Sequence, residues 1–221
     1  MTPEIAIVEN HHQVLPAWAQ ARRNSSAPLP VWTLDYHTDT MPCFRGKFPP
    51  PQDGDWQNPD VVADAVGKLR HDEHFDWALR AGILSEAHIG ICGESTDIIA
   101  HPAITVCRPE NYPSADIILN SPEEFRPQAE KFLESDTIRQ LFSRLPHPGE
   151  AYIFDIDCDC ILCEKSLHPA DGTLFSDLLN HAALITLSLE SDWVRLLKFP
   201  GETITAQDIA KNLLSFLTDI P

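Results

Sequence analysis

The sequence predicts a three-layer α/β/α fold with a mainly parallel sheet. Short apolar, β-branched runs typical of buried strands alternate with capped or amphipathic helical segments through most of the 221 residues. This alternation favours parallel strands with helices on both faces. An apolar content of 43% allows a sizeable core, and no internal linker divides the chain, so we expect one domain over residues 1–221.

Charge and hydropathy limit the classes of partner. A formal net charge of −17 argues against nucleic acid, because such binding needs basic surface to displace counterions. The same charge suits cationic partners. No run reaches the length of a membrane span, and the N-terminus lacks the pattern of a signal peptide. We therefore expect a soluble, cytoplasmic protein with no membrane partner.

Taken in order, the apolar runs predict strands at residues 4–9, 31–35, 89–92, 103–107, 116–119, 151–159 and 185–189. Helices are predicted after residue 14, over 58–70, 75–83 and 173–183, from 121 to about 145 with room for a break, and from 205 onward. Helix starts are signalled by Asn58-Pro59 and by capping boxes at 121–124 and 205–208. The proline-rich segment 41–57 is long enough to form a rim or lid.

Three metal-competent side chains crowd the end of the second predicted strand. In an extended segment, positions i, i+2 and i+4 share a face, so Asp35, His37 and Asp39 can point the same way. Two carboxylates and an imidazole on one face repel or stay protonated unless a cation lies among them. An ordinary polar turn is the alternative, and this segment alone does not decide between the two.

The strand at 151–159 carries a second set of such side chains. Its apolar start leads into Asp155, Asp157 and Asp159, which would share one strand face. Three carboxylates there would be costly to bury unless a cation or a water-filled cleft receives them. Solvated edge strands also carry alternating acids, which is the alternative interpretation.

The first strand ends in a polar junction with the following helix. Asn10 would cap that helix, and His11 and His12 would lie in its first turn. Ligands of open α/β sheets bind at the carboxyl ends of the strands, where all three polar sets should meet. Mixed imidazole and carboxylate ligands suit Mn, Fe or Zn, and excess carboxylate favours Mn. So many ligands exceed the need of one tetrahedral zinc and suit two metals with shared carboxylates, so we expect two Mn²⁺ ions.

These motifs resemble those of the arginase and agmatinase (ureohydrolase) superfamily. The resemblance is closest to a short arginase-like family that includes the peptide arginases, which convert arginine side chains to ornithine in ribosomally made peptides. It rests on the segments 8–11, 14–16, 35–39, 76–77 and 155–159. It implies an arginase/deacetylase-like fold and hydrolysis of guanidino groups with release of urea.

The resemblance also implies roles for individual residues. His11 and Asp39 would complete a first metal site, His37 and Asp157 a second, and Asp35 and Asp155 would bridge both ions. Asp39 would also orient the attacking hydroxide.

Two further residues receive catalytic roles. Glu190 lies where arginases place the acid that pairs with the substrate guanidinium. His74 is a candidate proton shuttle, but we favour its interpretation as a surface histidine on a helix. These roles agree with the chemistry of guanidinium hydrolysis. Hydrolysis of this resonance-stabilised cation needs a strong nucleophile, a carboxylate to orient the guanidinium, and a proton for the leaving amine.

The sequence departs from the arginase pattern after residue 39. Segment 40–45 lacks the polar loop with which arginases recognise the α-groups of free arginine. An arginine-containing peptide is therefore the expected substrate, and an acidic protein would suit a cationic peptide. Two other functions stay open, namely a deacetylase-like metal amidohydrolase with one zinc ion, and a metal- or peptide-binding module without catalysis.

A cysteine cluster has two interpretations. Cys158, Cys160 and Cys163 could form a structural zinc site with His168 as the fourth ligand. We favour small buried residues on the strand and the turn that follows it.

Overall fold

Parallel strands form the centre of the molecule. The computed structural model describes residues 3–93, 98–109 and 121–217. Within them, six strands form one sheet in the order β1-β6-β5-β2-β3-β4, and all neighbours are parallel. The predicted α/β fold is confirmed. The strands are β1 (Glu4–Val8), β2 (Leu29–Asp35), β3 (Leu84–Ile91), β4 (Ile104–Cys107), β5 (Ile153–Asp157) and β6 (Leu184–Ser188).

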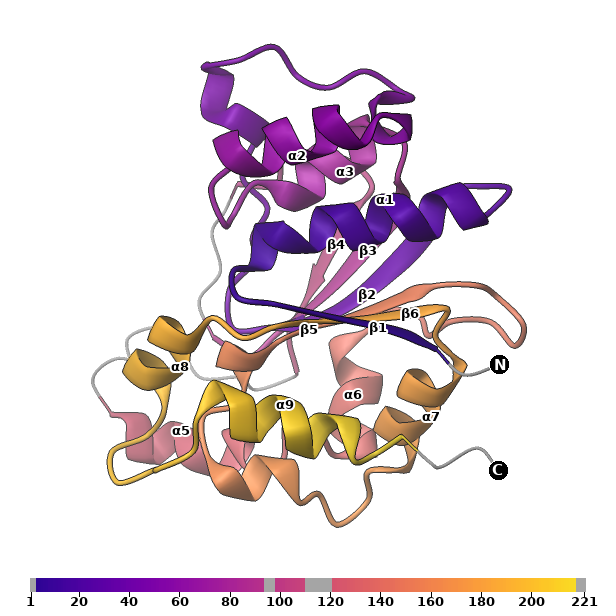
Figure 1. The fold of residues 1–221 in the computed structure, drawn as a ribbon. Helices are drawn as coiled ribbons and strands as arrows, with labels where there is room; N and C mark the ends of the chain where they lie inside the picture. The colour runs from indigo at the N-terminus through magenta and orange to yellow at the C-terminus, as the bar shows by residue number, and fades with distance from the viewer. Residues whose placement is uncertain (1–2, 94–97, 110–120, 218–221) are drawn as a thin grey trace.

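Helices cover both faces of this sheet (Figure 1). One face carries α1 (Leu15–Asn24), α2 (Pro59–Lys68) and α3 (His74–Arg80). The other carries α5 (Pro122–Ala129), α6 (Ser135–Leu141), α7 (Thr173–His181), α8 (Ser191–Leu197) and α9 (Ala206–Leu214). Short 3₁₀ turns lie at His11–Val14, Cys43–Gly46, Asp55–Gln57, Cys158–Cys160 and Glu164–Leu167.

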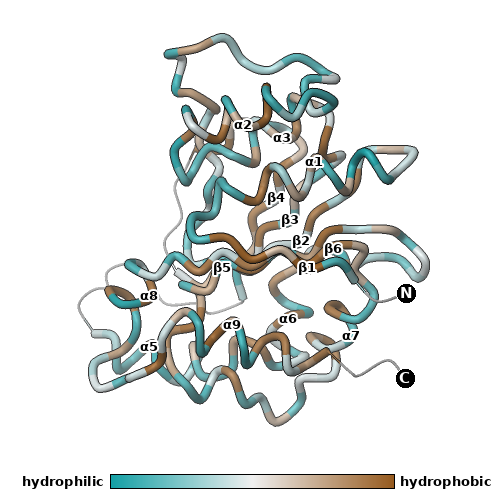
Figure 2. The backbone as a smooth tube through the Cα atoms, in the orientation of Figure 1, coloured by the Kyte–Doolittle hydropathy of each residue, from teal (hydrophilic) through white to brown (hydrophobic). Residues whose placement is uncertain are grey.

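Alternate strand residues enter different cores. In β2, Val31 packs in the core beneath α1–α3, whereas Trp32 and Leu34 pack in the core beneath α5–α9. Figure 2 shows hydrophobic residues concentrated along the strands, while the helices alternate between hydrophilic and hydrophobic positions. Because strand side chains alternate with a period of two, Asp35 lies on the same face as Val31, toward α1–α3. The acidic strand ends therefore face the smaller helical layer.

A few elements differ from the prediction. Strand β3 begins at Leu84 rather than at residue 89, because Ser85, Glu86 and His88 mask its apolar alternation. Residues 191–197 form α8, a helix the sequence did not indicate. The strand predicted at 116–119 lies outside the described residues.

The capping predictions have mixed outcomes. The side chains of Asn58 and Thr205 accept hydrogen bonds from Asp60 N and Asp208 N, as predicted for helix starts. Ser121 begins α5 without a side-chain cap bond, so its capping box is wrong. No helix within the described ranges combines the length and apolar composition needed to cross a bilayer.

Candidate metal centre

The acidic strand ends meet in the middle of the sheet. β2 and β5 are neighbours, with Thr33 paired to Asp155 and Leu34 to Ile156. Continuing this register places Asp35 beside Asp157, the last residues of their strands. Both side chains are almost completely buried. The sheet therefore brings together two carboxylates that are far apart in the sequence.

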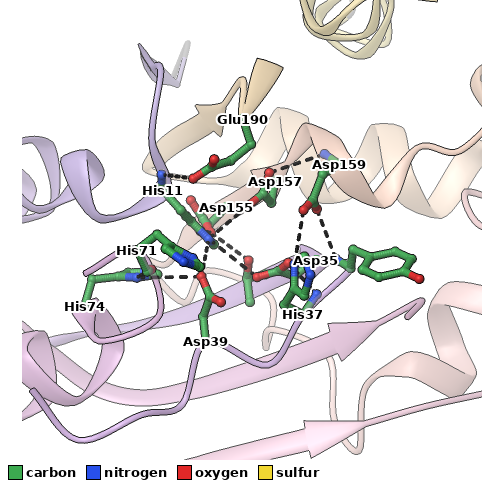
Figure 3. Close-up of polar contacts among 12 residues, drawn as sticks. His11, Asp35, His37, Asp39, His71, His74, Asp155, Asp157, Asp159 and Glu190 are labelled. Carbon is green, nitrogen blue, oxygen red and sulfur yellow. Dashed lines mark hydrogen bonds and ion pairs between the residues drawn. The ribbon is translucent and has the colours of Figure 1, made fainter. Parts of the chain in front are cut away.

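His11 lies over these carboxylates (Figure 3). It opens the 3₁₀ turn after β1 and is fully buried. Its Nδ1 is 3.0 Å from Asp39 Oδ2, 3.2 Å from Asp157 Oδ2 and 3.5 Å from Asp35 Oδ2. Burial disfavours the charged imidazole, but the attraction of Asp155 and Asp157 outweighs it and raises the pKa of His11 well above its ordinary value. Several acids thus converge on one nitrogen.

The carboxylates themselves are in an unfavourable electrostatic environment. Burial, then repulsion from Asp39 and Asp157, raises the pKa of Asp35 well above the ordinary range. Burial and repulsion from Asp159 do the same for the pKa of Asp157. Asp35 Oδ2 has no hydrogen-bond partner among the described residues. A divalent cation would relieve both the repulsion and this unpaired oxygen, so the donor set fits a metal.

A second group lies beside the first and shares Asp35. His37 Nδ1 is 3.1 Å from Asp159 Oδ2, and Asp35 Oδ1 accepts a hydrogen bond of 2.8 Å from His37 N. Burial opposes the charge on His37, but the hydrogen bond and charge of Asp159 raise its pKa to about 9. In each of two groups, His11/Asp35/Asp39/Asp157 and Asp35/His37/Asp159, the donor atoms lie within 4.8 Å of one another. Two adjacent sites with a common carboxylate are the arrangement of a binuclear centre.

Asp155 lies one residue pair below this row. Its Oδ2 is 2.7 Å from His11 Nε2 and accepts a 2.6 Å hydrogen bond from Thr33 Oγ1. Its Oδ1 accepts a hydrogen bond from Thr186 Oγ1. Both oxygens therefore already have protein partners. The bridging role implied by the resemblance stays a prediction, and the geometry gives Asp155 no place in either group.

His74 is buried rather than exposed, so its interpretation as a surface histidine is wrong. It is fully buried, and its ring centroid lies 4.2 Å from that of His11. Its Nδ1 donates to His71 O at 2.9 Å and lies 4.0 Å from Asp39 Oδ2. Burial and the charge of His11 lower the pKa of His74 well below its ordinary value. A neutral imidazole therefore lies beside the proposed first site.

Glu190 closes the site from the β6 side. Its Oε1 accepts a 2.7 Å hydrogen bond from His11 N, as Figure 3 shows. Burial raises the pKa of Glu190, although this hydrogen bond opposes the shift. Its carboxylate thus lies next to the acidic cluster, where sequence position alone had placed it.

Backbone strain is concentrated at the site and its rim. Among the described residues, four non-glycine residues have positive φ: Asp39 (48°), Phe44 (58°), Arg45 (44°) and Glu190 (40°). Such conformations cost roughly 1–3 kcal/mol each and persist only where the surrounding structure enforces them. Two belong to the candidate site, and the other two belong to the loop that follows it.

Two buried acids, Glu73 at the N-cap of α3 and Asp76 within it, hold that loop in place. Glu73 accepts from Phe44 N at 3.1 Å, and Asp76 accepts from Cys43 N at 2.9 Å. Both acids are about 1% exposed. The sequence signals for them were the position of Asp76 among apolar residues of α3 and its place in segment 76–77 of the resemblance. Residues 43–46 therefore form a fixed rim.

His37 is the predicted ligand with the most exposed side chain, at 26%. Trp193 of α8 packs edge-on against the His37 ring, with centroids 5.3 Å apart. The ring centroid of His71 lies 6.3 Å from that of Trp193. An aromatic ring and two imidazoles thus lie together at the most exposed predicted ligand.

The three clustered cysteines are buried, as we favoured from the sequence. Cys163 Sγ lies 3.1 Å from Ser166 Oγ, and Cys158 and Cys160 pack in the core beneath α5–α9. His168 is exposed on the surface of the following turn.

Comparisons with known proteins identify no family. No protein-family model matches the sequence, and no curated protein matches it. Among solved structures, the fold is similar to proclavaminate amidino hydrolase from Streptomyces clavuligerus, with a TM-score of 0.45 and 16% sequence identity. The match covers 97% of this chain and 64% of that one, so the chain spans less than two thirds of that protein's length. A likeness of this size establishes neither a family nor a reaction.

Proposed function

We propose that this protein is a binuclear metal-dependent hydrolase of guanidino groups. The observation that carries the proposal is that Asp35 belongs to two adjacent buried groups of metal-competent side chains. A shared carboxylate between imidazole-bearing sites is the arrangement that holds two ions close together. The abundance of carboxylates favours Mn²⁺.

The geometry supports one division of the ligands. His11, Asp39 and Asp157 would hold a first ion together with Asp35. A second ion would take Asp35, His37 and Asp159, where the resemblance had implied Asp157.

Bound ions would supply Lewis-acid chemistry and bring the pKa of a water molecule into the neutral range. The carboxylate of Glu190 faces the same space and is suited to pair with a guanidinium fork. When the C–N bond breaks to give urea, the departing amine needs a proton. His74 would take the proton released by the attacking water on Nε2 and pass it to the departing amine, since its Nδ1 already donates to His71 O while Nε2 has no hydrogen-bond partner among the described residues.

The proposed substrate is an arginine side chain within a peptide, which would become ornithine. The net charge of −17 and the acids at the site favour a cationic ligand. The rim at 43–46 carries Cys43, Phe44 and Arg45, and the Arg45 side chain is paired with Asp72 and Glu73. That leaves it unsuited to recognise a free α-carboxylate.

Elemental analysis and a urea assay test the proposal together. Purified protein loaded with Mn²⁺ should hold two equivalents per chain and release urea from arginine-containing peptides. One equivalent of zinc would instead support the deacetylase-like alternative. Two bound ions without urea from peptides or small guanidines would refute the reaction.

A matched pair of variants separates catalysis from simple binding. Asp35→Asn should abolish both urea release and the second ion, because Asp35 is common to both groups. Asp136→Asn is the control, since that side chain is 91% exposed and pairs only with Arg139. Full activity in Asp35→Asn would contradict the shared site.

A further inference from the structure

We infer that Asp155 is a positioning residue that holds His11 for the metal, rather than a ligand that bridges two ions. The inference rests on the proposed metal centre and changes the role of its most deeply placed acid. Asp155 and His11 are both fully buried, and His11 Nε2 lies 2.7 Å from Asp155 Oδ2. Since a carboxylate accepts, the proton of this bond lies on Nε2. Nδ1, which faces Asp35, Asp39 and Asp157, is then the ring nitrogen placed to bind an ion.

Sheet register fixes Asp155 in this position. Thr33, Asp155 and Thr186 are direct neighbours across β2, β5 and β6, so their side chains form one row on the face toward α1–α3. The two threonine hydroxyls donate to opposite oxygens of the Asp155 carboxylate. Trp18 of α1 donates to Thr186 Oγ1 at 3.1 Å and extends the chain of bonds into the helical layer. All of these side chains are fully buried.

In the next row toward the strand ends, by contrast, some buried polar atoms have no hydrogen-bond partner among the described residues. Asp157 is paired with Ser188, and Ser188 Oγ has no hydrogen-bond partner among the described residues. Asp35, its neighbour on β2, leaves Oδ2 equally unpaired. Polar atoms without partners lie where an ion would bind, whereas the row of Asp155 is satisfied by the protein itself. The contrast separates ligands from the residues that support them.

A carboxylate that accepts from a metal-bound histidine fixes its tautomer and ring orientation and raises its basicity. Here three acids, Asp35, Asp39 and Asp157, surround Nδ1 within 3.5 Å. Without the bond to Asp155, the ring could rotate or carry its proton on Nδ1, where it would compete with the cation. Loss of such a partner costs about 10–100-fold in metal affinity and leaves the number of ions unchanged.

The test compares Asp155→Asn with Asp157→Asn in the full chain, because both make the same change on the same strand face. Mn²⁺ affinity is measured by calorimetry, and bound Mn²⁺ is counted by elemental analysis after dialysis. We expect Asp155→Asn to keep two ions with about 10–100-fold weaker binding of one of them. Asp157→Asn should lose an ion. If Asp155→Asn binds fewer than two ions, Asp155 is a ligand and the inference is wrong.

A second pair of variants, at Thr33, tests the same inference in case Asp155→Asn or Asp157→Asn does not fold. Thr33→Val removes one hydroxyl donor to Asp155, and Thr33→Ser restores it. Thr33→Val should weaken Mn²⁺ binding with two ions retained, and Thr33→Ser should recover the wild-type affinity. Equal affinity in all three proteins would overturn the inference. Wild-type protein that binds no metal would instead refute the proposed centre, and urea release plays no part in either readout.

Discussion

Replacing Glu73 with alanine should destabilise the loop that follows the Asp35–Asp39 motif. The Glu73 carboxylate accepts from Phe44 N and Arg70 N, both at 3.1 Å, and lies 2.9 Å from Arg45 Nε. Hydrogen bonds to a buried charged group contribute about 1.5–3 kcal/mol each, and losing the acceptor leaves two backbone donors unpaired. Removing a buried charge offsets part of this cost. We expect a net loss of about 2–4 kcal/mol in the free energy of unfolding.

Urea denaturation and thermal melting of the metal-free chain measure this loss. For a chain of this length, about 2–4 °C in Tm corresponds to each kcal/mol, so the melting temperature should fall on the order of 10 °C. Asp72→Ala is the matched control, because Asp72 also pairs with Arg45 but its side chain accepts from no backbone group in this loop. That partly exposed pair should contribute less than about 1 kcal/mol. If the two variants lose equal stability, Glu73 does not hold the loop.

Three further predictions concern the ions and the substrate. Because the pKa of His37 is raised to about 9, binding of Mn²⁺ must displace its proton, and the apparent affinity should rise at least about tenfold per pH unit from pH 7 toward 9. The raised pKa values of His11 and Asp35 add to this slope. Calorimetry in two buffers counts the released protons, and an affinity independent of pH would contradict the prediction. Glu190→Gln keeps an acceptor for His11 N but removes the negative charge. The KM for an arginine peptide should therefore rise about 10–100-fold while both ions are retained. An unchanged KM would exclude a contact between Glu190 and the guanidinium. Trp193→Ala should raise the same KM about 3–30-fold, because the aromatic face for a cation–π contact is lost. Trp193→Phe keeps an aromatic face, so its KM should lie close to the wild-type value. Equal KM values in the two variants would show that Trp193 does not contact the substrate.

The strand ends were predictable because each motif follows an apolar run. Period-two alternation predicts Asp155, Asp157 and Asp159 as equivalent positions on one strand face. This is wrong for Asp159, because β5 ends at Asp157 and Asp159 lies in the 3₁₀ turn that follows. Which of them stands level with Asp35 depends on the register between β2 and β5, a long-range pairing that local sequence does not encode. The sequence therefore indicated a metal centre but could not decide which of these aspartates are its ligands.

Burial on α3 was harder to foresee. Residues 73–79 are all buried, so His74 lies inside together with Glu73 and Asp76, although acidic residues are mostly exposed. Their partners lie about 30 residues earlier, in a loop whose conformation has positive φ at non-glycine positions. Secondary-structure propensity gives no indication of such a loop, because the strained loop conformation persists only through tertiary contacts.

The site carries two kinds of unfavourable energy, and an ion can relieve just one of them. Backbone strain at Asp39 and Glu190 is held by the fold, since Glu190 N donates to Glu9 O at 2.8 Å and its side chain accepts from His11 N. Repulsion among the buried carboxylates, seen in the raised pKa of Asp35, disappears once a cation lies between them. It follows that the fold sets the positions of the ligands before any ion arrives. Metal binding should then change the protonation of the site far more than its shape, with His37 giving up its proton and Asp35 becoming fully ionised.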